Sequence, residues 1–166
     1  MSEYGITKLV HLGAIVFWLG PPLGAWLVLR TVEDGSYKQG SIAEKVSRVF
    51  YLTVILEHVA FIALLASGLL MALKYDLMGS AWLNQKIYIV FLVIVPLEVA
   101  DVLLGNWIAS TASKKLYAGK PLKSWERYGL EAYHGIFTKI ALIVIPLSVL
   151  TIMYLATSKV VLGTLS

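Results

Sequence analysis

The fold is decided by the stretch Val49–Leu73, which reads VFYLTVILEHVAFIALLASGLLMAL, with Glu57 and His58 as its only acidic or basic residues. A helix needs about 20 consecutive apolar residues to cross the hydrocarbon core of a bilayer. The stretch has that length and therefore predicts a transmembrane helix. Three further apolar runs predict three more: Leu9–Leu29, Ile87–Leu104 and Gly135 to about Ala156.

The composition agrees with a chain that lies in lipid. Of the 166 residues 58% are hydrophobic and 14% are charged, and the mean hydropathy is +0.78. Soluble domains of this length keep roughly a quarter of their residues charged. The net charge of +4 is carried by short loops between the apolar runs, which argues against nucleic acid as a partner. The chain contains no cysteine, which excludes disulfides, thiolate metal sites and covalent haem attachment.

The four runs predict an all-α fold: one transmembrane domain over residues 1–166, with helices at approximately 6–30, 42–74, 83–110 and 125–158. The first and third loops together hold nine Lys and Arg residues, and the opposite side holds four (Lys8, Lys74, Lys86 and Lys159). Loops rich in Lys and Arg stay in the cytoplasm. We therefore expect an up-down-up-down bundle with both termini on the non-cytoplasmic side.

The predicted spans contain an unusual number of ionisable side chains. Such residues are costly in a membrane unless they are paired, so each is a candidate functional residue. They are His11 on the first helix, Glu57 and His58 on the second, Glu98 and Asp101 on the third, and Glu131, His134 and Lys139 on the fourth.

Helical spacing and depth group these residues. Glu98 and Asp101 are three residues apart and share a helix face, as do Glu131 and His134. At a rise of about 1.5 Å per residue, His58 and His134 lie at similar depths below the cytoplasmic surface. We expect Glu98 at the level of Glu57 and His58, and Asp101 against His134 or Lys139.

This inner group favours three interpretations. The first is a non-covalent b-type haem, one or two per chain, with His58 and His134 as axial ligands and Glu98 and Asp101 as proton carriers. The second is a metal site formed by His58 and His134 with Glu57 and Glu131, because Glu-x-x-His on one helix is half of the carboxylate-bundle pattern. The third is a set of buried ion pairs that only hold the bundle together.

Short motifs resemble known membrane families. The first helix carries Lys8-Leu-Val-His11 followed by Trp18-Leu-Gly20, and the third begins with Trp82-Leu-Asn-Gln-Lys86. The first segment resembles small bacterial membrane proteins of the copper-resistance D (CopD) type, the HemJ-type protoporphyrinogen oxidases and a related uncharacterised group. The segment of the third helix resembles the HemJ type. The end of the fourth helix, from Ile145 to Leu155, is most similar to that uncharacterised group. The resemblance implies a four-helix haem or porphyrin binder of the bacterial inner membrane, with His11 and Lys86 near a site on the outer side.

Together these patterns predict a cytochrome b-like electron-transfer protein or subunit, an oxidoreductase linked to quinone and to a redox partner subunit. The alternative is a non-redox transporter or accessory subunit, alone or in a homo- or hetero-oligomer.

Overall fold

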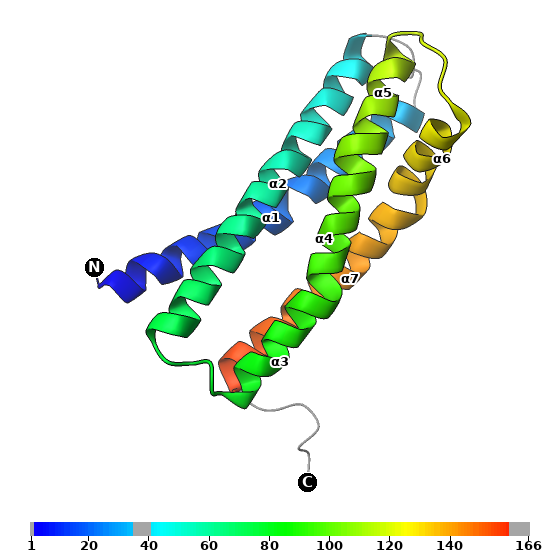
Figure 1. The fold of residues 1–166 in the computed structure, drawn as a ribbon. Helices are drawn as coiled ribbons and strands as arrows, with labels where there is room; N and C mark the ends of the chain where they lie inside the picture. The colour runs from blue at the N-terminus through cyan, green and yellow to red at the C-terminus, as the bar shows by residue number, and fades with distance from the viewer. Residues whose placement is uncertain (1, 35–40, 160–166) are drawn as a thin grey trace.

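The computed structural model describes residues 2–34 and 41–159, which form four long helical rods and no strand (Figure 1). The first rod is α1 (Glu3–Asp34) and the second is α2 (Ser41–Lys74). The third joins α3 (Ala81–Ile89), η1 (Val90–Ile94), α4 (Val95–Asp101), η2 (Val102–Ala109) and α5 (Ser110–Tyr117). The fourth joins α6 (Ser124–Ala132), η3 (Tyr133–Phe137) and α7 (Thr138–Ser158).

Each rod is long and apolar enough to cross a membrane, over Glu3–Val32, Ile42–Lys74, Ala81–Tyr117 and Ser124–Ser158. Large apolar side chains point outward along all four, and Leu92, for example, is 72% exposed. An outer surface of this kind matches hydrocarbon rather than water. The predicted all-α architecture of four apolar helices is confirmed, and the chain has the character of a multi-pass membrane protein. The first and third rods extend beyond the predicted helices by up to seven residues, whereas the second and fourth begin one residue earlier and end where predicted.

The third and fourth rods contain three wide, π-helical turns. At the end of each turn a backbone N–H donates a hydrogen bond to the carbonyl oxygen five residues earlier: Val95 to Val90, Ser110 to Gly105, and Thr138 to Tyr133. The first lies just before Pro96, which has no N–H and would clash with the carbonyl four residues back in an ordinary turn. Pro21, Pro22 and Pro146 lie inside α1 and α7, which continue through them.

The rods pack as two hairpins. The start of α1 is fastened to the end of α2 by an ion pair between Glu3 and Lys74, and α5 is fastened to α6 by one between Lys115 and Glu126. In Figure 1 the start of α1 and the end of α7 lie toward the end of the bundle that holds the α2–α3 connection. The α5–α6 connection lies at the opposite end.

Two apolar clusters divide the interior along its length. One, which we call the α5-end cluster, is formed by Leu29, Phe50, Tyr51, Val54, Ala109 and Tyr133. The other, the α3-end cluster, is formed by Trp18, Ala60, Phe61, Ile94 and Val149. Four ionisable residues of the second and third rods lie between these two clusters: Glu57, His58, Glu98 and Asp101.

Candidate functional site

The centre of the candidate site is His58 on α2. Its Nδ1 lies 3.0 Å from Oε2 of Glu98, and its Nε2 lies 3.4 Å from Oδ2 of Asp101. Glu98 and Asp101 are one turn apart on the third rod, so one imidazole ring can bridge them. The side chain of His58 is 13% exposed and that of Asp101 16%. The predicted shared face of Glu98 and Asp101 is therefore confirmed, as is the level of Glu98 beside His58.

Glu98 is held by a second partner on α1. The indole N–H of Trp18 donates a hydrogen bond of 2.8 Å to Oε1 of Glu98, while Oε2 faces His58. Trp18 is 2% exposed and Glu98 4%. Both carboxylate oxygens of Glu98 thus have a partner, which is what a buried carboxylate requires.

Asp101 is approached from the fourth rod by Tyr133, whose hydroxyl group lies within electrostatic range of the carboxylate. The phenol ring lies against Gly105, one turn beyond Asp101. A Cβ atom at Gly105 would be 2.7 Å from Cζ and from the hydroxyl oxygen of Tyr133. Only glycine leaves room for the ring here. Asp101 therefore meets His58 and Tyr133, and the expectation that it would meet Lys139 or His134 is wrong.

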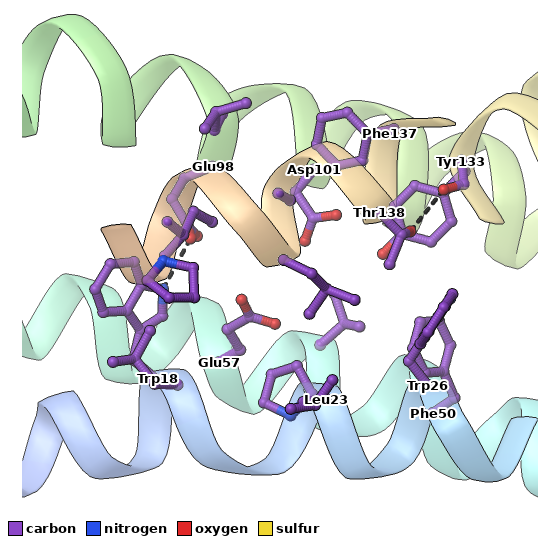
Figure 2. A pocket seen from close by; sticks show the side chains of 18 residues that line it. Trp18, Leu23, Trp26, Phe50, Glu57, Glu98, Asp101, Tyr133, Phe137 and Thr138 are labelled. Atoms are coloured by element: carbon purple, nitrogen blue, oxygen red, sulfur yellow. Dashed lines mark hydrogen bonds between the residues drawn. The ribbon is translucent and has the colours of Figure 1, made fainter. Parts of the chain in front are cut away.

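Glu57 is the third carboxyl group at the centre. Figure 2 shows the carboxyl groups of Glu57, Glu98 and Asp101 pointing into the same space, the inner part of a pocket between α1 and α7. Glu57 is half-buried and lies within electrostatic range of the other two. No described residue forms a hydrogen bond or an ion pair with it.

A second polar group lies toward the α5 end. The hydroxyl group of Tyr51 is 3.1 Å from the Ser113 hydroxyl and 3.0 Å from Nε2 of His134. His134 is 5% exposed, and its Nδ1 has no hydrogen-bond partner among the described residues. The rings of Tyr51 and Tyr133 stack with their centroids 6.5 Å apart, so the two polar groups are neighbours.

His11 forms a separate site toward the other end. Its Nδ1 lies 3.1 Å from the Leu64 carbonyl oxygen and 3.1 Å from the Ser67 hydroxyl. A carbonyl oxygen can only accept, so Nδ1 carries the proton and Nε2 keeps its lone pair. The ring packs on Gly68, where a Cβ atom would be 3.0 Å from Cε1 of His11. Lys86 is within electrostatic range and also lies 5.9 Å from the Trp82 ring.

The structure separates several residues that the sequence grouped. His58 and His134 have different partners. His134 contacts α2 at Tyr51, which is seven residues before His58, or about 10 Å along the helix. Glu131 and Lys139 are exposed, and neither contacts the centre. Within residues 2–34 and 41–159, no group of three His, Asp or Glu side chains is arranged to hold a metal ion. The haem ligand pair stays a prediction.

Four contributors to the site were not predicted from the sequence: Trp18, Tyr51, Ser113 and Tyr133. The sequence position of Trp18 could have identified it. Tyr and Trp belong at the ends of a membrane helix, where the polar atom reaches water. Trp18 lies near the middle of the first predicted span, so its N–H needed a partner inside the protein.

Comparison with known proteins adds no relative: no family model, curated protein or solved structure matches the chain. The function is therefore inferred from the geometry of the site.

Proposed function

We propose that this is a proton-carrying membrane protein, with both termini outside the cytoplasm and the buried carboxyl and imidazole groups as the carriers. The observation that supports this most strongly is the position of His58, with one ring nitrogen facing Glu98 and the other facing Asp101. An imidazole in this position accepts a proton on one nitrogen and releases one from the other.

The remaining polar groups extend this relay in one direction. From Asp101 the next group is the Tyr133 hydroxyl, and beyond it lie Tyr51, His134 and Ser113 near the α5 end. On the other side of Glu98, Trp18 can donate a hydrogen bond but cannot accept a proton, and the α3-end cluster lies beyond it. Proton transport across the membrane therefore requires this cluster to open to water. A proton reaches the centre from the α5 end through groups that both donate and accept.

The distribution of Lys and Arg indicates which side of the membrane the relay opens to. The loops at the α5 end are the first and third, which carry nine of the Lys and Arg residues against four on the other side. By the positive-inside rule the relay opens toward the cytoplasm. A reporter fused after Ser166 should lie outside the cytoplasm. A cytoplasmic C-terminus would reverse the direction.

The decisive experiment is proton flux in liposomes that contain the purified protein and a trapped pH indicator, with valinomycin and potassium to set the membrane potential. We expect flux in the native protein and its loss in Asp101→Asn, which keeps the size of the side chain but removes the proton site. Glu131→Gln is the matched control, because it removes an exposed carboxyl group of the same chain. Native protein with no flux above empty liposomes would reject the proposal.

A b-type haem protein is the second candidate, and the geometry of His11 favours it. A ligating histidine commonly donates its other N–H to a backbone carbonyl, which fixes the tautomer, and Nδ1 of His11 does this with Leu64. His58 and His134 fit less well, since each ring nitrogen of His58 faces a carboxylate and Nε2 of His134 is bonded to Tyr51. A bound haem would supply electron transfer. An absorption spectrum of protein purified from haem-replete cells tests this, with His11→Ala expected to lose the Soret band and His58→Ala to keep it. A colourless native protein would exclude haem.

A further inference from the structure

The pocket of the candidate site opens between α1 and α7. These two helices do not pack tightly against each other at the level of Glu57. Apolar residues form its walls: Leu19, Leu23 and Pro22 on α1, and Leu142, Ile145 and Pro146 on α7. Leu23 is 46% exposed, so the opening lies on the outer, lipid-facing surface. A molecule dissolved in the bilayer can therefore enter from the side.

The inner end of this cleft is acidic. The carboxyl groups of Glu57, Glu98 and Asp101 all border it (Figure 2). The basic residue His58 contacts Glu98 and Asp101. Three carboxyl groups face one imidazole, so the site has an excess of negative charge whenever more than one of them is ionised. Uncompensated carboxylates away from water cost several kcal/mol each. The site is therefore complementary to a cation.

Aromatic rings surround the same space. Trp18, Trp26, Phe50, Tyr133 and Phe137 line the cleft together with the carboxyl groups. Aromatic faces attract ammonium groups, most strongly where water is excluded. The volume of the cleft is about 80 Å³, well below the roughly 300 Å³ at which pockets for drug-sized ligands begin. It admits a small head group, while the rest of the ligand lies between the apolar walls and in the lipid.

We propose that the cleft between α1 and α7 binds a lipophilic cation, an ammonium head group on an apolar chain, with Glu57 as its counter-ion. This proposal rests on the proposed function, because it uses the proton relay. The cation takes the place of a proton on Glu57, and that proton leaves by the relay. Glu57 is the carboxyl group available for this role, because Glu98 and Asp101 already have partners among the described residues.

The test uses dodecyltrimethylammonium, whose charge is permanent, and the full-length protein in phosphatidylcholine nanodiscs. Calorimetric titration, with empty nanodiscs subtracted, should show saturable binding that weakens as the pH is lowered, since protons compete for Glu57. A pH indicator in weak buffer should register proton release on binding. Dodecanol, which has the same chain and no charge, should not bind saturably.

Two variants separate the carboxyl group from the cleft. Glu57→Gln should weaken binding by about tenfold or more, about 1.4 kcal/mol, whereas Glu131→Gln should bind as the native protein does. Ala141 lines the cleft, so Ala141→Phe should fill it from α7 while every carboxyl group is kept, and it should also lose saturable binding. Its melting temperature shows whether it is folded.

The outcomes distinguish the two proposals. Equal binding by native protein and Glu57→Gln, or equal binding of dodecanol, overturns the cation site even if proton flux is present. Saturable, Glu57-dependent binding with no proton flux in liposomes keeps the cation site and rejects the relay.

Discussion

His58 and His11 are the same residue type in neighbouring helices, yet they have opposite surroundings. His58 lies between two carboxyl groups, whereas the Nδ1 of His11 faces a backbone carbonyl and a hydroxyl group. The first environment places a carboxyl group beside each ring nitrogen and offers routes for protons on both sides. The second fixes a neutral tautomer and leaves Nε2 with its lone pair. The chemistry of a membrane histidine is thus set by its partners more than by its burial.

The largest expected difference in stability is between His58→Leu and His11→Leu. His58→Leu leaves Glu98 and Asp101 without their shared partner, and we expect the free energy of unfolding to fall by roughly 3–5 kcal/mol. His11→Leu removes a hydrogen bond between neutral groups and should cost about 1 kcal/mol. Unfolding in mixed micelles of rising SDS content, followed by circular dichroism, measures both. Equal losses would show that the two environments do not differ in energy.

The second prediction concerns the partner of Asp101. Asp101→Asn weakens its contacts with His58 and Tyr133 and should cost about 1–3 kcal/mol. Lys139→Met should not restore this loss, because Lys139 is exposed and away from the centre. The double variant should equal the sum of the single changes within about 0.5 kcal/mol, as distant sites do. Recovery of stability in the double variant would place Lys139 beside Asp101 after all.

The smallest effect is expected at the two glycines against which side chains of the two sites pack. At Gly105 a methyl group would overlap the Tyr133 ring, which is held in place by its neighbours, so Gly105→Ala should cost about 1–2 kcal/mol net. At Gly68 it would lie 3.0 Å from Cε1 of the His11 ring, a milder overlap than the 2.7 Å at Gly105. Because alanine favours helix over glycine by up to about 1 kcal/mol, Gly68→Ala should be close to neutral. The same SDS titration compares them, and a larger loss at Gly68 would mean that His11 is the more rigidly held ring.

The sequence predicted the features that depend on one helix at a time. The apolar runs located all four rods, and the three-residue spacing of Glu98 and Asp101 located their common face. It could not predict which helices meet, because that depends on the rotation of each rod about its axis. A π turn changes this rotation, since one added residue turns the remainder of the rod by roughly 100°.

The fourth rod shows the effect of such a turn. Glu131 and His134 were expected on one face, but η3 begins at Tyr133, between them. His134 is buried and Glu131 is exposed. No residue type in the stretch from 133 to 137 signals the wide turn, because π turns lack a sequence signature as clear as a capping residue or a proline.

The central network takes residues from every rod, with Trp18 from the first, His58 from the second, Glu98 and Asp101 from the third, and Tyr133 from the fourth. This has a consequence for biogenesis. While the chain is still being inserted, the carboxyl groups of the third helix have their histidine but lack the tyrosine that arrives last. A truncated or misassembled chain therefore exposes polar groups to lipid, which membrane quality control can recognise. The network thus marks a completed bundle as well as forming its site.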